Sequence, residues 1–308
     1  MKKVFIDGKS GTTGLRIYER LADRADIELL TLSDDERRSP EARKRMLNAC
    51  DIAFLCLPDD AARESVSMIE NENTVVLDTS TAHRTDDAWA YGFPELSASH
   101  REKLLNSKRV AVPGCHASGF IALVYPLISA GILPADALLT CHSITGYSGG
   151  GKKMIADYEA PERAERLGSP GIYGLTLRHK HLPEMQKICG LASKPVFSPI
   201  VDDYYKGMAT TVTFHMSQLQ GVSTVQEVRD KLAAHYAGQN MVKVAEGTSS
   251  GLLYGAAKAG SDTMTIVVAG NDQRFTVTAL FDNLGKGASG AAIQNMNIAI
   301  GADPVKGL

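Results

Sequence analysis

The chain has little of what marks secreted, membrane or nucleic-acid-binding proteins. Its 308 residues carry a formal net charge of −2, so we expect neither a broad basic surface for nucleic acid nor a basic helix for a membrane surface. The five cysteines are odd in number and show neither a C-x-x-C pair nor the spacing of metal ligands, which argues against a disulfide framework and a zinc site. The expectation is a cytoplasmic protein with a small-molecule partner and no metal.

Long apolar runs are also scarce. After Met1-Lys2-Lys3 only three apolar residues precede Asp7, too few for the core of a secretory signal. Residues 117–135 carry no charge and approach the length of a membrane span, but Pro126 and Gly131 interrupt them. We therefore expect a buried helix that ends near Gly131. With 44% hydrophobic and 22% charged residues, the chain is long enough for two domains, each with its own core.

The first 112 residues alternate short apolar runs with amphipathic helical patterns. Runs that are apolar throughout and separated by helices are typical of parallel strands joined by right-handed βαβ units. The predicted strands are Lys3–Asp7, Ile27–Leu32, Asp51–Leu57, Thr74–Asp78 and Lys108–Val112. This part of the chain predicts an α/β, Rossmann-like dinucleotide-binding domain.

From about residue 136 the apolar runs are longer, richer in Thr and Val, and joined in part by hairpin-like turns such as Gly270-Asn271-Asp272. Helices are predicted over 224–236, where Thr224 and Glu227 match a capping box, and over 288–300. The run 283–287, with two glycines, is predicted to be a loop before the second of these helices. The predicted strands are Leu138–Tyr147, Pro195–Val201, Met208–Met216, Met264–Ala269 and Arg274–Phe281. We expect an α+β domain with a mainly antiparallel sheet.

A glycine-rich run, Gly8-Lys9-Ser10-Gly11-Thr12-Thr13-Gly14, follows the first predicted strand and opens a helix. Glycine lets the backbone approach a pyrophosphate closely, and the start of a helix supplies N–H donors and positive potential. The spacing is G-x-x-G-x-x-G instead of G-x-G-x-x-G, so a plain strand-to-helix turn is the alternative. The predicted cofactor contacts in this run are Gly8, Ser10, Gly11, Thr12, Thr13 and Gly14.

The type of dinucleotide depends on residues 33–38, which follow the second predicted strand. Ser33 with Arg37 and Arg38 suits a 2′-phosphate, as in NADP. Asp34 or Asp35 suits a ribose hydroxyl, as in NAD. We favour NADP(H). Further cofactor contacts are expected from residues just past the ends of later strands: Pro58, Ser80 and Asn283.

Cys115 stands out among the five cysteines because it lies between a Pro-Gly turn and a long apolar helix pattern. A thiol at that place is near unpaired backbone N–H groups and the positive end of the helix dipole, which lower its pKa and favour the thiolate. A thiolate attacks acyl groups. Cys115 is therefore a candidate nucleophile, and the alternative is a small buried hydrophobic residue, the usual state of a free cysteine.

Two histidines, His179 and His181, lie in a predicted loop. Without cysteine or carboxylate ligands at matching spacing, a pair at i and i+2 is poor evidence for a metal site. A nucleophilic cysteine needs an acid/base partner, and histidine titrates in the right pH range. We therefore expect one of the two histidines to transfer protons.

Three further residues are candidates for binding the anionic groups of a substrate. Arg84 follows an apolar strand at the carboxyl edge of the predicted sheet, where ligands bind in open α/β folds. Ser148 and Lys153 lie in the run 146–153, where a strand end leads into a glycine loop with two lysines. The alternative for Arg84 is a surface cation. The alternative for 146–153 is a mobile connection with solvated lysines.

In this order, the motifs resemble those of the N-acetyl-gamma-glutamyl-phosphate reductases of arginine biosynthesis, in their shorter variety. The matching runs span essentially the whole chain: Gly8–Gly14, Leu57–Asp59, Asp78–Ser80, Tyr91–Leu96, Pro113–Cys115, His179–Glu184 and Gln294–Asn297. The resemblance implies NADPH-dependent reduction of N-acetyl-gamma-glutamyl phosphate, an acyl phosphate, to N-acetylglutamate semialdehyde. It also implies a thioester on Cys115, His179 as the acid/base, and a homodimer or homotetramer.

The sequence departs from the family pattern directly after the cysteine. His116 stands where an aromatic residue is common, and Ser118 stands in place of a threonine. His116 is therefore a further candidate for the site, as a catalytic group, a substrate contact or a packing residue. His181 is a candidate substrate contact by its place in the motif.

The expected domains are an NADP-binding domain of residues 1–114 with 285–308 and a catalytic and oligomerisation domain of residues 115–284. The nearest alternative activity is that of an aspartate-semialdehyde dehydrogenase, which the resemblance places on the same fold with the same thioester chemistry. An alternative of another class is a non-catalytic NADPH-sensing protein. The presence of both Cys115 and His179 argues against the sensor.

Overall fold

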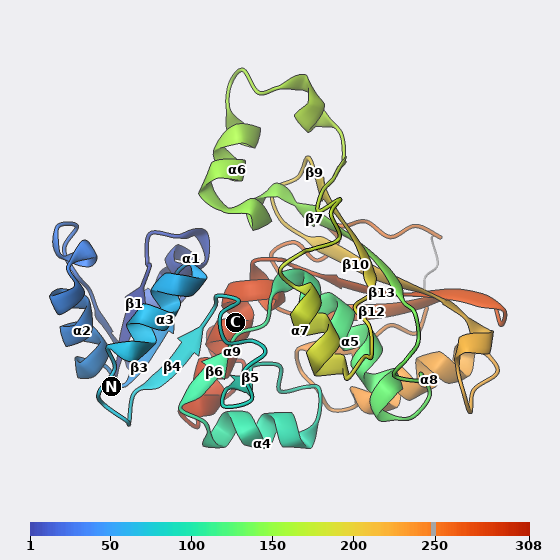
Figure 1. Ribbon diagram of the computed structural model, residues 1–308, viewed down its shortest axis with the longest axis horizontal. Coiled ribbons are helices and arrows are strands. Elements are labelled where there is room, and N and C mark those ends of the chain that lie inside the picture. Colours follow the sequence, from blue (N-terminus) through green and yellow to red (C-terminus); the bar gives the residue numbers. More distant parts are fainter. Residues whose placement is uncertain (248–250) are drawn as a thin grey trace. The chain divides into compact units, whose positions relative to one another are not determined.

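The computed structural model describes residues 1–247 and 251–308, which form two compact units (Figure 1). Unit 1 comprises residues 1–114 and 288–308, and unit 2 comprises residues 115–287. Each unit is built around a sheet of its own. Within the described residues, no helix is both long enough and apolar enough to cross a membrane.

Unit 1 contains a six-stranded sheet of order β2-β1-β3-β4-β6-β5, in which all neighbouring strands are parallel. The predicted parallel sheet is thus confirmed. Its strands are short and apolar, as expected where helices cover both faces. They are β1 (Lys2–Asp7), β2 (Ile27–Leu30), β3 (Ile52–Leu55), β4 (Val75–Asp78), β5 (Ala90–Tyr91) and β6 (Arg109–Ala111). The two-residue β5 is too short to show a pattern in the sequence.

Helices cover both faces of this sheet. Val4 and Phe54 belong to one buried cluster with residues of α1 and α9, whereas Phe5 and Leu55 belong to another with residues of α2 and α3. Because adjacent strand residues point to opposite faces, the two clusters lie on opposite sides of the sheet. The helices are α1 (Thr12–Ala22), α2 (Pro40–Ala49), α3 (Asp59–Ser67), α4 (Ala98–Asn106) and α9 (Gly290–Ala299).

Unit 2 contains a seven-stranded sheet of order β11-β12-β13-β10-β7-β9-β8. Four of its strand pairs are antiparallel, and the pairs β7·β9 and β11·β12 are parallel. The expectation of a mainly antiparallel sheet is confirmed, and β7 and β9 can be parallel because a long crossover joins them. The strands are β7 (Thr140–Gly146), β8 (Gly171–Ile172), β9 (Val196–Asp202), β10 (Met208–His215), β11 (Val242–Val244), β12 (Met264–Gly270) and β13 (Arg274–Phe281).

The long apolar run of the sequence is helix α5 (Cys115–Ser129), which lies against β10 and β13 and beside α7 (Leu182–Cys189) (Figure 1). Close packing requires Gly119, since a Cβ there would lie 2.4 Å from Thr210 Oγ1. The helix ends at Ser129, and Gly131 follows with φ +68°, which confirms the predicted end.

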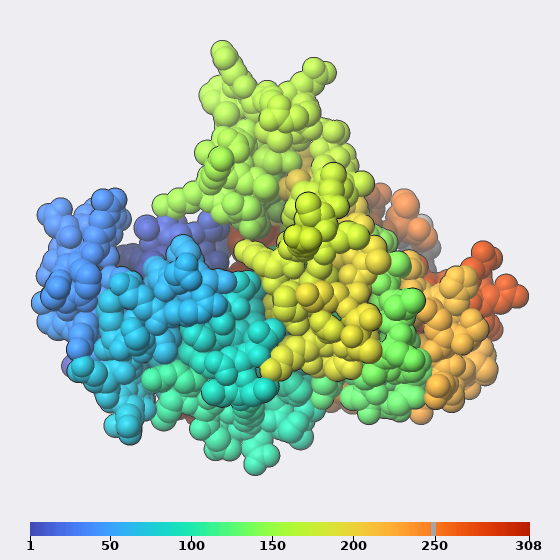
Figure 2. Space-filling view, viewed as in Figure 1, coloured from blue at the N-terminus to red at the C-terminus, as the bar shows by residue number. Residues whose placement is uncertain are grey.

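The remaining helices of unit 2 are α6 (Gly151–Glu159) and α8 (Val225–His235). The predicted capping box of α8 is present: Thr224 Oγ1 accepts from Glu227 N at 3.2 Å, and Glu227 Oε2 accepts from Thr224 N at 3.0 Å. The turn after Gly270 joins the antiparallel strands β12 and β13, as predicted. In Figure 2 the segment that carries α6 stands out from the rest of unit 2.

Two segments expected to be loops are helical. Residues 146–153 contain a 3-10 turn, Tyr147–Gly150, followed directly by α6, and the run 283–287 enters a π-helical turn, Gly285–Ser289. In the second case Asp282 caps the turn, because its Oδ1 accepts from Leu284 N at 2.7 Å and from Gly285 N at 3.2 Å. Glycine content alone was therefore a misleading guide to both segments.

Candidate active site

Cys115 is the first residue of α5, so its thiol lies at the helix N-terminus as the sequence predicted. Its side chain is half-buried. Burial raises the pKa of Cys50 and Cys56 to about 12, and it also raises the pKa of Cys141 and Cys189. These four cysteines are thiols at neutral pH, whereas the helix start favours the thiolate of Cys115.

The π-helical turn Gly285–Ser289 packs directly on the cysteine. A Cβ on Gly287 would lie 3.0 Å from the Cβ of Cys115, so a side chain at this position would press on the nucleophile. The same turn carries Lys286, whose side chain is only 2% exposed. Single π-helical turns of this kind are frequent at functional sites.

Three histidine rings of unit 2 gather around His116, the residue that follows Cys115. His116 lies in α5, and His179 and His181 precede α7. The ring centroids of His116 lie 5.6 Å from His179 and 5.7 Å from His181, and those of His179 and His181 are 4.9 Å apart. Phe197 packs against His116 and His179. The structure thus brings together the three histidines predicted as candidates for the site.

Burial keeps the rings of His116 and His179 uncharged. It lowers the pKa of His116 to about 3 and that of His179 to about 4, with a smaller contribution from the charge of Lys180 in both cases. His179 Nδ1 accepts from the backbone N of His181 at 3.3 Å, which leaves the proton of the neutral ring on Nε2. Both histidines are therefore neutral at pH 7.

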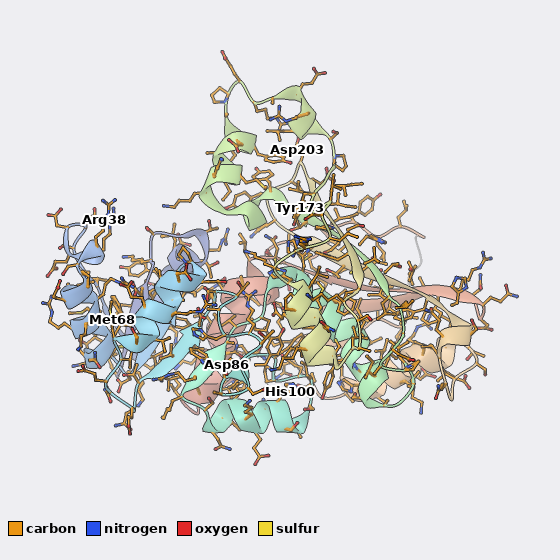
Figure 3. All side chains as sticks on the ribbon, viewed as in Figure 1. Arg38, Met68, Asp86, His100, Tyr173 and Asp203 are labelled. Carbon is orange, nitrogen blue, oxygen red and sulfur yellow. The ribbon has the colours of Figure 1, made fainter. Side chains whose placement is uncertain are left out.

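Both ring nitrogens of His116 have partners. Nδ1 lies 2.8 Å from Ser143 Oγ, and Nε2 lies 2.8 Å from Tyr173 Oη. Ser143 Oγ lies 2.7 Å from Thr210 Oγ1. Tyr173, labelled in Figure 3, was not found from the sequence. Burial, with a smaller contribution from the negative charge of Cys115, raises the pKa of the Tyr173 hydroxyl, so the phenol stays protonated at neutral pH.

The other substrate candidates of unit 2 differ in their surroundings. Ser148 is buried, and its Oγ accepts from Asn283 Nδ2 at 3.0 Å. Asn283 Oδ1 in turn accepts from Gly207 N at 2.9 Å. Lys153 is exposed on α6. The hydrogen bond between Ser148 and Asn283 links the segment after β7 to the segment before the π-helical turn. The binding roles of Ser148, Asn283 and Lys153 stay predictions.

The glycine run of unit 1 borders a pocket of about 650 Å³, lined by residues 5–10, Leu15, Tyr18, Leu29–Leu32, Asp34, Arg37, Arg38, Arg43, Leu57 and Ala61. Gly8 has φ +87°, and a Cβ on it would lie 2.3 Å from Cys56 O. A Cβ on Gly14 would lie 2.5 Å from Gly8 O. Glycine at these positions therefore allows the tight turn under the pocket, the arrangement that a pyrophosphate needs.

The pocket is lined by some, but not all, of the residues predicted to distinguish NADP from NAD. Arg37 and Arg38 line it, and Figure 3 labels Arg38 on the segment between β2 and α2. Arg37 is paired with Asp34 at 3.2 Å. Ser33 is not in the lining, since its Oγ donates to Glu36 Oε2 at 3.0 Å and accepts from Glu36 N. The two arginines fit a 2′-phosphate.

Arg84 is tied to backbone oxygens in unit 1. Its Nε donates to Val112 O at 2.8 Å and its Nη2 to Thr79 O at 2.7 Å, and only 8% of the residue is exposed. These bonds fix the end of β6, three residues before Cys115 in the chain. An anion-binding role for Arg84 stays a prediction.

Ser80 and Pro58 lie at the carboxyl ends of strands, as expected. Ser80 Oγ donates to Asp78 Oδ2 at 2.7 Å, and His83 Nδ1 lies at the same distance from that oxygen. Pro58 precedes α3 as its N-cap residue. Their contacts with a cofactor stay predictions.

Comparison with protein families matches both units. The semialdehyde dehydrogenase dimerisation domain matches residues 115–283, and the semialdehyde dehydrogenase NAD binding domain matches residues 36–104. Among solved structures, aspartate semialdehyde dehydrogenase II of Vibrio cholerae has a TM-score of 0.73 at 15% identity and covers 97% of this chain and 98% of its own. The enzyme of Francisella tularensis gives 0.73 at 14% identity, with 97% and 99% covered. These structures confirm the fold.

Curated relatives named N-acetyl-gamma-glutamyl-phosphate reductase are more similar in sequence. The protein of Brucella anthropi is 46% identical and that of a Chelativorans species 48% identical, each over 97% of this chain and 98% of its own. One from a Nostoc species, named N-acetyl-gamma-glutamyl-phosphate reductase 2, is 42% identical over 99% of both chains. The chain belongs to the N-acetyl-gamma-glutamyl-phosphate reductase family.

Proposed function

We propose that the protein reduces N-acetyl-gamma-glutamyl phosphate to N-acetylglutamate semialdehyde with NADPH, releasing phosphate, in arginine biosynthesis. The observation that carries this proposal is the placement of Cys115 at the first position of α5, in a chain of this family. The next residue is the neutral His116, whose ring centroid lies 5.6 Å from that of the neutral His179. An acyl phosphate is a substrate that a cysteine thiolate can attack.

Cys115 forms and breaks the covalent bonds to the substrate. The thiolate attacks the acyl carbon, a C–S bond forms, and the C–O bond to phosphate breaks, so that phosphate leaves with the electron pair and a thioester remains. After reduction of the thioester carbonyl, the C–S bond breaks, the aldehyde leaves and the thiolate of Cys115 is restored. The start of α5 stabilises the negative charge at the beginning and end of this cycle.

His179 serves as the acid/base. Because burial lowers its pKa to about 4, the ring is neutral at pH 7. Its Nε2–H can donate a hydrogen bond to the oxygen that acquires charge, and the ring accepts the thiol proton of Cys115 at Nδ1, in place of the hydrogen bond from His181 N. The imidazolium and thiolate then stabilise each other, which offsets the low pKa of the isolated ring. The same proton is returned to the oxygen or phosphate that acquires charge. His181, His116, Arg84, Lys153 and Ser148 are the candidates for substrate contacts.

The pocket of unit 1 suits NADP(H). When bound, this cofactor supplies the hydride that reduces the thioester carbonyl. The backbone from Gly8 to Gly14 would hold the pyrophosphate, with the side chains of Ser10, Thr12 and Thr13 as further donors. Arg37 would bind the 2′-phosphate, and Ser33, Pro58, Ser80 and Asn283 remain candidates for further contacts.

We assign the cofactor to a domain of residues 1–114 with 285–308, and catalysis and oligomerisation to residues 115–284. The match of unit 2 to a dimerisation domain supports a homo-oligomer, dimer or tetramer. The surface proposed for this contact is the face of the unit 2 sheet opposite α5, where Thr140, His142 and Thr213 are exposed. A cytoplasmic location agrees with five free cysteines, since disulfides are rare there.

The test is phosphate-dependent reduction of NADP by the purified protein, with N-acetylglutamate semialdehyde and aspartate semialdehyde compared. Turnover of the acetylated substrate alone is expected. Preference for aspartate semialdehyde would establish the alternative activity. No reduction of NADP with either substrate would favour the NADPH-sensing alternative, and binding of NADPH would then be measured.

The catalytic assignment is tested by substitution. Cys115→Ser should abolish turnover and leave NADPH binding intact, because a serine hydroxyl is a far weaker nucleophile than a thiolate at neutral pH. Cys50→Ala, at a buried cysteine of unit 1, should stay active. His179→Asn should lower kcat by about 100-fold, and more than His181→Asn does. The reverse order of the two histidine variants would make His181 the base.

A further inference from the structure

A buried carboxylate lies in the wall of the unit 1 pocket. Asp7 is the last residue of β1, directly before Gly8, and it lines the pocket although only 5% of it is exposed. The dinucleotide assigned to this pocket is an anion at its pyrophosphate, and NADP carries a 2′-phosphate as well. In surroundings with little water, a free carboxylate at this place would repel such a ligand strongly. Binding of the cofactor therefore requires that the charge of Asp7 be neutralised.

Arg43 of α2 lies against this carboxylate. Its Nε and its Nη2 each lie 3.1 Å from Asp7 Oδ2, so two nitrogens of the guanidinium meet the carboxylate. Only 11% of the Arg43 side chain and 6% of the Asp7 side chain are exposed. Arg43 and Asp7 thus form a buried ion pair, and loss of either partner would leave an uncompensated charge.

The guanidinium of Arg43 has further partners within unit 1. Nη2 donates to Ser65 Oγ at 2.6 Å, and this oxygen lies 2.9 Å from Asp7 Oδ2. Nη1 donates to Glu64 Oε2 at 3.2 Å, and the Glu64 side chain is half exposed. Each of the three guanidinium nitrogens therefore has an acceptor on β1 or α3. Although Arg43 lines the pocket, its hydrogen bonds are made to the protein.

Other cations in the pocket wall are placed differently. Arg37 is paired with Asp34, and the side chains of both are exposed. Lys9 Nζ lies 3.2 Å from the centroid of the Tyr18 ring, which carries no charge. Either cation can turn to a phosphate group without leaving a buried carboxylate behind. Arg43 cannot do so, because Asp7 would then lose its partner.

We propose that Arg43 neutralises Asp7 in the wall of the pocket, so that the anionic cofactor can bind, and that Arg43 makes no bond to the cofactor itself. Arg43 is thus a positioning residue that acts through the charge of Asp7. The proposal rests on the assignment of NADP(H) to the pocket of unit 1. It does not depend on which semialdehyde the protein forms.

Binding of NADPH to the full chain, measured by isothermal titration calorimetry, tests the proposal without substrate. Arg43→Met should raise Kd by about tenfold, because the uncovered carboxylate repels the cofactor. Asp7→Asn should lower Kd by about threefold, because the positive charge of Arg43 is then no longer balanced. The double variant carries neither charge, and its Kd should return to within about twofold of the wild type.

Three outcomes would overturn the proposal. A double variant that binds as weakly as Arg43→Met would show that Arg43 bonds to the cofactor directly. An unchanged Kd in Arg43→Met would show that the charge of Asp7 does not oppose binding. A Kd that does not fall in Asp7→Asn would show the same. A purely structural role of the pair predicts weaker binding in all three variants, so the rescue and the tighter binding distinguish the two roles.

The matched control is Lys44→Met, at the next position of α2. Lys44 lies outside the pocket lining, and its ion pair with Glu70 is exposed, so Kd should stay within about twofold of the wild type. A tenfold rise in this control would overturn a special role for Arg43. Circular dichroism shows which variants are folded. If Arg43→Met does not fold, Asp7→Asn decides, because the amide oxygen still accepts from Arg43.

Failure of the proposed function would look different from failure of this proposal. A wild type that binds NADPH and reduces NADP with neither semialdehyde would refute the proposed function, and the Kd values would still decide the role of Arg43. A wild type that does not bind NADPH would overturn the cofactor assignment and this proposal with it.

Discussion

At the scale of single residues, buried histidines couple proton binding to folding. Burial lowers the pKa of His116 to about 3, whereas a histidine in an unfolded chain titrates near 6.5. Between these values the unfolded chain binds more protons than the native protein. The free energy of unfolding therefore falls as the pH falls through this range, and the sign is the same for His179.

We expect His116→Phe to remove part of this pH dependence. As the pH falls from 7 to 5, protonation of His116 in the unfolded chain should lower the free energy of unfolding of the wild type by about 2 kcal/mol. The phenylalanine variant has no such group, and its loss should be smaller by that amount. Urea unfolding of both proteins at the two pH values measures the difference. Equal losses would contradict a buried, neutral His116.

Sequence reasoning found Cys115 and the two histidines before α7 because their chemistry is local. A cysteine at a helix start and two closely spaced histidines are visible in a few residues. Tyr173 could not be found in this way. It meets His116 across 57 residues, and the Ser143–Thr210 pair spans 67, so only the folded sheet brings these hydroxyls together.

At the scale of elements, the turn between β1 and α1 requires glycine at two of its three glycine positions. These are Gly8 and Gly14, whereas Gly11 has room for a side chain. A Cβ on Gly14 would lie 2.5 Å from the backbone O of Gly8, which cannot move without breaking the turn. At Gly11 the corresponding distance is 3.4 Å, and φ is −72°, which any residue can adopt. The pattern of three glycines therefore contains both a required and a tolerant position.

Gly14→Ala should lower the free energy of unfolding of unit 1 by about 1–3 kcal/mol, because the new methyl group overpacks the turn. Gly11→Ala is the matched control and should stay within about 0.5 kcal/mol of the wild type. Thermal and urea unfolding of the two variants measure the effect. Equal losses in both variants would show that the distances around Gly8 do not govern the stability of the turn.

The sequence predicted regular elements better than irregular ones. Buried strands and the capped α8 have periodic patterns, whereas the π-helical turn Gly285–Ser289 is built by the carboxylate of Asp282 and by packing on Cys115. Glycines in such a run indicate close approach of the backbone as readily as a loop. The parallel pairing of β7 with β9 is also set by a long crossover that no local pattern records.

At the scale of the whole molecule, the sheet of unit 2 has a face that its own helices leave partly open. α5 covers the other face along β10 and β13. On the open face, alternate residues of three neighbouring strands are exposed: Thr140 and His142 in β7, Val196 in β9, and Thr213 and His215 in β10. A broad surface of Thr, Val and His is suited to contact with another copy of the chain.

Charge placed on this face should weaken the oligomer. In a contact with two-fold symmetry the same residue enters from both copies, so His142→Glu combined with Thr213→Glu brings four carboxylates to one interface. Like charges in a desolvated contact cost several kcal/mol, and the exposed positions leave the fold of the monomer unchanged. Light scattering should give a mass of two or four chains for the wild type and a smaller mass for the variant. Lys231→Glu, on α8 away from the open face, is the control and should keep the wild-type mass. An unchanged mass in the double variant would place the contact on another surface.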